Sequence, residues 1–149
     1  MLFRSELLTH PDIDVNIEEP FGETALYRAS HAGRAALVRE LLNNDKVDVN
    51  RTGEDGLTPL RAAIWKGHIE VVRELLKYNK VDVNLANDYG DAALMVATKD
   101  GGNWDLLGEL ITQKNVDLNV RRRLGYTLLM WATQKGNFDM VSQLLQHNT

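Results

Sequence analysis

The sequence predicts an all-α fold, a solenoid of stacked helix-turn-helix units joined by short β-hairpin-like turns. The segment Val-Asp-Val-Asn, or a close variant, ends at Asn16, Asn50, Asn84 and Asn119, with spacings of 34, 34 and 35 residues. A fixed period of this length indicates units that each contact only the preceding and following unit. We therefore expect one domain, residues 1–149, made of a partial repeat 1–16 and full repeats 17–50, 51–84, 85–119 and 120–149.

Each full repeat contains the signals of two helices. In three repeats a Thr precedes an apolar helical pattern, where its hydroxyl can cap the first helix: Thr24, Thr58 and Thr127. Pro59 suits the first turn of such a helix, since the N–H that it lacks has no helical partner there. The second helices place apolar residues at helical spacing, as in Val71, Val72, Leu75 and Leu76.

Glycines mark the ends of these elements. One glycine in each repeat is expected to end the first helix in the left-handed conformation: Gly33, Gly67, Gly102 and Gly136. Another is expected to sit at the tip of the turn: Gly22, Gly56, Gly90 and Gly125. The Asn that closes each repeat is expected to bond nearby backbone and to hold the linking turn.

The third repeat departs from this pattern. Ala92 replaces the capping Thr, so we expect Asp91 to cap the helix one residue early. Gly101-Gly102 supplies the additional residue behind the spacing of 35, and Gly108 lies inside the second helix, at a cost of roughly 1 kcal/mol relative to Ala. Because stability in stacked repeats is close to a sum of local contributions, we expect this repeat to be the least stable.

The pattern closely resembles the ankyrin repeat, over the whole chain. The second full repeat carries it most clearly, in Gly56-Leu57-Thr58-Pro59-Leu60, Gly67-His68 and Leu75-Leu76. Residues 3–16, with Phe3 and Leu7, resemble the second helix and tail of a truncated repeat. The His that usually follows Thr-Pro-Leu is replaced in all four full repeats, which predicts looser packing there: the replacements are Tyr27, Arg61, Met95 and Met130.

Composition excludes several classes of protein. The formal net charge is −4, with 26% charged and 44% hydrophobic residues, which is atypical of disordered chains. Residues 1–100 hold 12 basic and 17 acidic side chains (−5), and residues 101–149 hold 5 and 4 (+1), so we expect no nucleic-acid partner. No apolar run approaches the roughly 20 residues that span a bilayer. The chain has no cysteine, and we expect a cytoplasmic monomer.

No motif indicates catalysis, a metal or a cofactor. None of the four histidines pairs with another ligand at a metal-binding spacing: His10, His31, His68 and His147. Neighbouring carboxylates such as Glu54 and Asp55 lie in predicted turns open to water, whereas catalytic pairs need a cleft that separates their pKa values. Arg121-Arg122-Arg123 is the one basic run; it could bind phosphates or an acidic peptide, but three charges on a turn are more often solvated. We therefore expect a protein without enzymatic activity.

The resemblance to ankyrin repeats implies a protein partner, bound on a concave face of turns and first helices. The positions that stacking leaves free hold one aromatic residue per repeat, and aromatics dominate interface hot spots. We expect Trp65 and Tyr89 to contribute most to binding. The predicted partner-binding residues are Phe21, Glu54, Asp55, Leu57, Trp65, Lys66, Asp88, Tyr89, Asp91, Lys99, Arg123 and Tyr126.

Three functions fit these observations. The first is a protein-interaction module acting as adaptor, scaffold or inhibitor. The second is a substrate-recognition or targeting fragment of a larger multidomain enzyme or effector, which the truncated first repeat favours slightly. The third is a structural or engineered stack without a dedicated partner, against which the irregular third repeat argues. The resemblance also implies possible hydroxylation of the repeat-closing Asn50 and Asn84 in animal cells.

Overall fold

A computed structural model describes residues 10–122 and 124–147. The expectations for Phe3, Leu7 and Arg123 lie outside these residues. The chain folds as two compact units, Met1–Asp82 and Val83–Thr149. The described residues form helices and turns without a strand, as the all-α prediction requires. Within the described part of the chain, no helix has the length and apolar character needed to cross a membrane.

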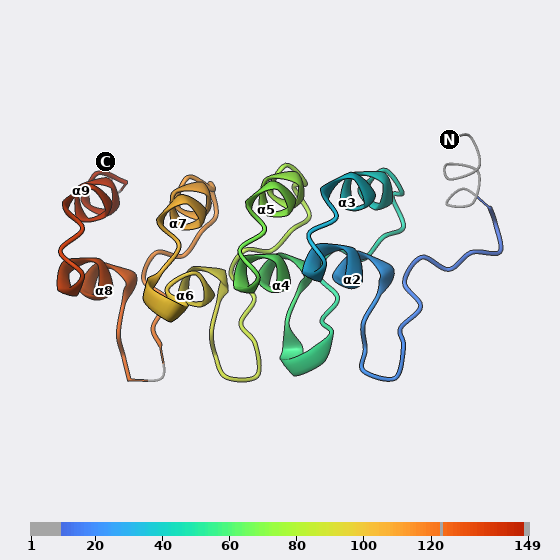
Figure 1. Cartoon of the computed structure of the whole chain (residues 1–149), viewed down its shortest axis with the longest axis horizontal. Helices are drawn as coiled ribbons and strands as arrows, with labels where there is room; N and C mark the ends of the chain where they lie inside the picture. Colours follow the sequence, from blue (N-terminus) through green and yellow to red (C-terminus); the bar gives the residue numbers. More distant parts are fainter. Residues whose placement is uncertain (1–9, 123, 148–149) are drawn as a thin grey trace. The chain divides into compact units, whose positions relative to one another are not determined.

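The first unit contains two complete helix pairs. The first pair is α2 (Ala25–His31) and α3 (Ala35–Leu42), and the second is α4 (Pro59–Trp65) and α5 (Ile69–Leu76), preceded by the 3-10 turn η1 (Glu54–Gly56). Helix α2 packs on α4 and α3 packs on α5, so the two repeats lie side by side (Figure 1). Their shared core is apolar, with the fully buried side chains of Leu26, Val38, Leu60, Val72 and Leu75.

The second unit contains the third and fourth repeats. Helix α6 (Ala93–Val96) is only four residues long and is followed by the 3-10 turn η2 (Lys99–Gly101) and by α7 (Trp104–Ile111). Helices α8 (Leu128–Gln134) and α9 (Phe138–Gln146) form the fourth repeat. The buried side chains of this unit include Leu94, Leu106, Leu107, Leu110 and Leu128.

The capping predictions hold in three repeats and fail in the third. The hydroxyls of Thr24, Thr58 and Thr127 accept hydrogen bonds from the backbone N–H three residues ahead. In the third repeat Ala92 occupies the capping position without a side-chain bond. The carboxylate of Asp91, which the sequence predicts to cap this helix, forms ion pairs with Lys99 and Arg122.

The linking turns are hairpin-like, as predicted. Each closes through two backbone bonds; in the first repeat Gly22 N–H donates to Glu19 O at 2.8 Å, and Glu19 N–H to Glu23 O at 3.2 Å. The same pair recurs around residues 53–57, 87–91 and 122–126. All eight glycines assigned to turns and helix ends have positive φ, from 67° to 86°.

The repeat-closing asparagines bond the next repeat, not the local turn that the sequence suggested. Asn50 Nδ2–H donates to Lys80 O at 2.7 Å, and Asn50 Oδ1 accepts from Asp82 N–H at 2.8 Å. Asn16 and Asn84 make the same two bonds to their following repeats. A side-chain amide presents a donor and an acceptor together, so it matches the C=O and N–H of a neighbouring chain segment.

Replacement of the usual His does not loosen the first three repeats, contrary to expectation. Tyr27, Arg61 and Met95 are only 1–2% exposed. The Tyr27 ring lies directly over Gly53, where a Cβ would approach it to 2.9 Å, and its burial raises the pKa of Tyr27 to about 12. Arg61 donates to the carbonyl of Gly56. These larger side chains fill the space themselves; only Met130, at 53%, is exposed.

One ion pair between repeats makes stability depend on acidity. Arg39 of α3 and Lys77 both bond Glu74, at 3.0 Å and 2.9 Å, and hold the pKa of Glu74 at about 2. Because the pKa of Glu74 is lower in the folded state, its ionised carboxylate stabilises the fold at pH values above the unfolded pKa of 4.5. This stabilisation is lost as the pH falls toward 2 and the carboxylate is protonated. We predict that Glu74→Gln flattens the fall of the unfolding free energy over this range, measured by urea denaturation.

The control for this prediction is Glu40→Gln on α3, since Glu40 has no ion pair among the described residues. It should leave the acid dependence unchanged. An equal pH dependence of the unfolding free energy in wild type and Glu74→Gln would contradict the role assigned to the Glu74 ion pair.

The third repeat should open more readily than the second. Its first helix has four residues and no side-chain cap, against seven residues and a capping Thr in α4. Gly108 also lies inside α7, where Gly is less favourable than Ala. We predict that amides of residues 92–112 exchange with deuterium faster than those of residues 58–78. Equal protection of the two segments, read by mass spectrometry, would contradict this.

Candidate functional site

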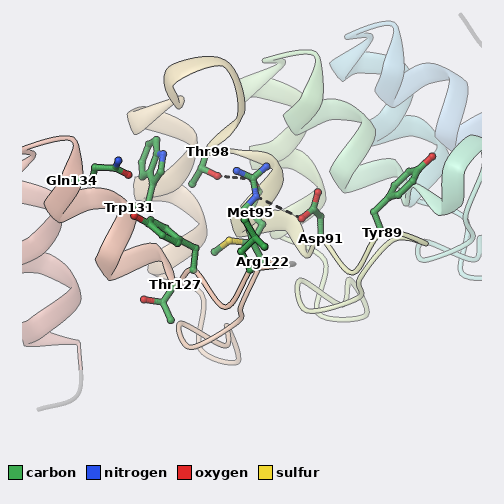
Figure 2. A pocket seen from close by; sticks show the side chains of 10 residues that line it. Tyr89, Asp91, Met95, Thr98, Arg122, Thr127, Trp131 and Gln134 are labelled. Carbon is green, nitrogen blue, oxygen red and sulfur yellow. Dashed lines mark hydrogen bonds and ion pairs between the residues drawn. The ribbon is translucent and has the colours of Figure 1, made fainter.

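A pocket of about 430 Å³ lies in the second unit, between the third and fourth repeats. Half of its lining residues are apolar or aromatic, and one Asp and one Arg form an ion pair at its edge (Figure 2). The lining residues are Tyr89, Asp91, Met95, Thr98, Arg122, Leu124, Tyr126, Thr127, Trp131 and Gln134.

The third repeat supplies one wall from its turn and from α6. Asn87 Oδ1 accepts from Tyr89 N–H at 3.0 Å and from Asp91 N–H at 2.8 Å, which fixes the turn that carries both residues. Met95 follows on α6 and is 2% exposed. Thr98 Oγ1–H donates to Met95 O at 2.7 Å, so the hydroxyl proton is held by the helix end.

The fourth repeat supplies the opposite wall. Arg122 N–H donates to Tyr126 O at 2.9 Å, which closes the turn that carries Leu124. Thr127 then caps α8, and Trp131 lies one turn along that helix. The Trp131 ring packs on Trp104 of α7, with centroids 4.6 Å apart.

The pocket exists because this pair of repeats fills its interface differently from the first pair. In the first unit the ring of Tyr27 covers Gly53. The corresponding positions in the second unit are Met95 and Arg122, which follow at the repeat spacing. Arg122 pairs with Asp91, and Met95 and Arg122 both line the hollow between the two repeats (Figure 2).

Two cations share one carboxylate at the edge of the pocket. Lys99 Nζ lies 3.5 Å from Asp91 Oδ2, and Arg122 Nε lies 3.7 Å from Asp91 Oδ1. The Asp91 side chain is 13% exposed, whereas those of Arg122 and Lys99 are 35% and 38% exposed. Within the part of the chain that the structure describes, two positive groups, Lys99 and Arg122, therefore lie beside this one carboxylate.

Comparison with known proteins identifies the repeats. The family profile described as "Ankyrin repeats (3 copies)" matches residues 5–87 and again residues 75–149. The chain belongs to the ankyrin repeat family. The structure is similar to the crystal structure of EF0377, an ankyrin repeat protein, with a TM-score of 0.80 and 26% sequence identity. That match covers 95% of this chain and 72% of the other. No curated protein sequence matches the chain.

In this ankyrin repeat chain, the pocket brings together three of the predicted partner-binding residues, Tyr89, Asp91 and Tyr126. Tyr89 and Tyr126 are 65% and 41% exposed. Lys99 joins them through its ion pair with Asp91. Asp88 is exposed on the same turn but does not line the pocket.

The remaining predicted residues belong to the first unit. Phe21 and Trp65 are 72% and 50% exposed, Glu54, Asp55 and Lys66 are exposed, and Leu57 is half-buried. Two groups lie beside the Trp65 ring: Lys66 Nζ is 4.3 Å from the ring centroid, and the His31 ring is 6.2 Å away. Burial lowers the pKa of His31, which favours the neutral ring beside Trp65.

Sequence reasoning missed Met95, Arg122 and Trp131 as parts of a site. Met95 was interpreted as a replacement for the usual His, and Arg122 as part of a basic run that is more often solvated. The position of Trp131, one residue beyond Met130, predicts only a half-buried helix residue. One signal could have found Arg122: the repeat places it where the earlier repeats have Glu19, Gly53 and Asn87. A cation that appears at this position only in the fourth repeat suggests a local function.

Proposed function

We propose that this ankyrin repeat chain is a protein-interaction module that binds a partner protein through its turns and first helices. The pocket of the second unit is the main binding site for the partner. Ankyrin repeats are generally protein–protein interaction modules, which sets the class of function. One observation supports this location of the binding site. Two exposed tyrosines, Tyr89 and Tyr126, line a pocket that is already formed in the absence of a partner.

The chemistry of the pocket supports binding over catalysis. Its one carboxylate, Asp91, is held by two cations, and the hydroxyl of Thr98 donates to the backbone. The hydroxyl of Thr127 caps α8. None of these groups is arranged as a nucleophile beside a general base. Aromatic walls with a few polar groups suit recognition of a side chain.

The proposal predicts that the double variant Tyr89→Ala/Tyr126→Ala weakens partner binding about 30-fold, or about 2 kcal/mol. The substitutions remove two aromatic rings that contact the partner. Neither ring is buried in the fold, so the protein should remain folded. The partner is first captured from native lysate with the intact chain and identified. Its dissociation constant is then measured by isothermal titration calorimetry with each purified variant.

Phe138→Ala is the matched control for this experiment. Phe138 is 81% exposed, lies on the second helix α9 and does not line the pocket. It should leave the affinity unchanged. Equal weakening by both variants, or no weakening by the tyrosine variant, would contradict the location. Trp65→Ala tests separately whether the first unit also contacts the partner.

A further inference from the structure

We infer that the pocket of the second unit recognises a peptide segment of the partner in which an apolar side chain lies beside a carboxylate. The apolar side chain enters between Met95 and Trp131, and the carboxylate binds Arg122. This inference rests on the proposed function and names the chemistry of the partner at that site.

Arg122 has donors to offer. Its Nε lies 3.7 Å from Asp91, beyond ordinary hydrogen-bond distance, and Asp91 is its one ion-pair partner among the described residues. A guanidinium carries five N–H donors in a planar fork that matches the two oxygens of a carboxylate. The side chain lines the pocket and is 35% exposed, so a ligand can reach the fork (Figure 2).

The charge of the cluster favours one carboxylate over other groups. Lys99 and Arg122 together exceed Asp91 by one positive charge. A basic ligand would have to compete with both cations for the largely buried Asp91. A phosphate group near pH 7 carries about −1.5 to −2 charges, more than this excess can neutralise. A single Asp or Glu side chain balances it.

The walls select an apolar neighbour for that carboxylate. Met95 is unbranched and adapts to different shapes, and the aromatic side chain of Trp131 lines the same pocket. Leu124 stands at the site with 92% of its surface exposed, so a bound peptide can cover it. The volume of about 430 Å³ falls in the range of roughly 300–1,000 Å³ of pockets that bind small ligands.

The test begins with a random dodecapeptide library displayed on phage and selected on the intact chain. We expect the enriched sequences to share an apolar residue next to Asp or Glu. One enriched peptide is synthesised with Glu or Asp intact, with the corresponding amide, and with phosphoserine in its place. Affinities are measured by calorimetry, and the fluorescence of the Trp104–Trp131 pair reports binding at the pocket itself.

Two variants isolate the guanidinium. Arg122→Gln should weaken the acidic peptide at least tenfold, and should weaken its amide analogue far less, since the two changes remove the same contact. Arg121→Gln removes the neighbouring exposed charge, which does not line the pocket, and should change the affinity less than twofold. Arg122→Lys keeps the charge without the fork and should be intermediate. Circular dichroism verifies that each variant is folded.

Several outcomes would overturn the inference. These are a basic or purely apolar consensus, equal binding by wild type and Arg122→Gln, or tighter binding of the phosphoserine peptide. Each of them would leave the proposed interaction module standing, provided that the tyrosine variant still weakens the partner. A library that yields no peptide whose binding alters the tryptophan fluorescence would instead count against both.

Discussion

Replacing Gly102 by Ala should destabilise the protein by about 1–3 kcal/mol more than replacing its neighbour Gly101. Both glycines have positive φ, 86° and 97°, so an Ala side chain strains the backbone at either position. A Cβ at position 102 would lie 2.1 Å from the Trp131 ring, whereas at position 101 nothing lies within 4 Å. The Trp131 ring would have to move away from Trp104, and the pocket wall would move with it.

Urea unfolding of the two single variants measures this difference. Tryptophan fluorescence of the folded state should change in Gly102→Ala, since the ring pair at 4.6 Å separates, and should stay close to wild type in Gly101→Ala. Peptide binding at the pocket should weaken only in Gly102→Ala. Equal stabilities for the two variants would show that the Trp131 ring does not pack against Gly102.

Asn50→Ala is expected to cost about 1–3 kcal/mol of stability, since two hydrogen bonds are lost and each contributes about 0.5–1.5 kcal/mol. Those bonds join Asn50 to the carbonyl of Lys80 and the N–H of Asp82 in the following repeat. Asn119 holds the same position at the end of the third full repeat, and its side chain has no partner among the described residues. Asn119→Ala should therefore cost less than about 0.5 kcal/mol, as surface substitutions usually do.

Thermal and urea unfolding of these two variants compare one residue type at one repeat position. Equal losses would mean that the asparagine acts through its own turn, as the sequence first suggested. A loss of stability in Asn50→Ala alone would confirm that the Asn50 side chain stabilises the contact between two repeats. Hydroxylation of Asn50 or Asn84, implied by the family resemblance, would modify a side chain already engaged in these bonds.

The features that sequence reasoning predicted are those that depend on local chemistry. Thr24 and Thr58 cap their helices because a hydroxyl there bonds an N–H three residues away. Gly33 and Gly67 adopt positive φ because the end of a short helix requires it. A period of 34 residues fixes how often these signals recur, so the repeats and their helix pairs could be placed without coordinates.

The features that it could not predict depend on which residues meet across an interface. Asp91 was expected to cap a helix, but two cations distant in the repeat pattern, Lys99 and Arg122, hold its carboxylate. The pocket likewise arises from the pairing of Met95 with Arg122, where the first unit pairs Tyr27 with Gly53. The identity of either residue alone does not predict whether the space between the two repeats is filled.

The candidate site was predicted in part for the same reason. Variable positions of the repeat identified Tyr89 and Tyr126, because stacking leaves them exposed. Trp131 follows Met130 of the first helix by one residue, a position that predicts a half-buried side chain. The side chain is half-buried and packs on Trp104, but the sequence did not indicate that it also lines the pocket.

The most direct test of this binding surface maps it residue by residue. Amide spectra of the ¹⁵N-labelled chain are recorded during titration with the partner, or with the acidic peptide selected from the library. We predict the largest shifts at residues 89–98 and 122–134, together with the indole N–H of Trp131. Shifts confined to the second helices α3, α5 and α9 would place recognition on the other face of the repeats and contradict the proposed site.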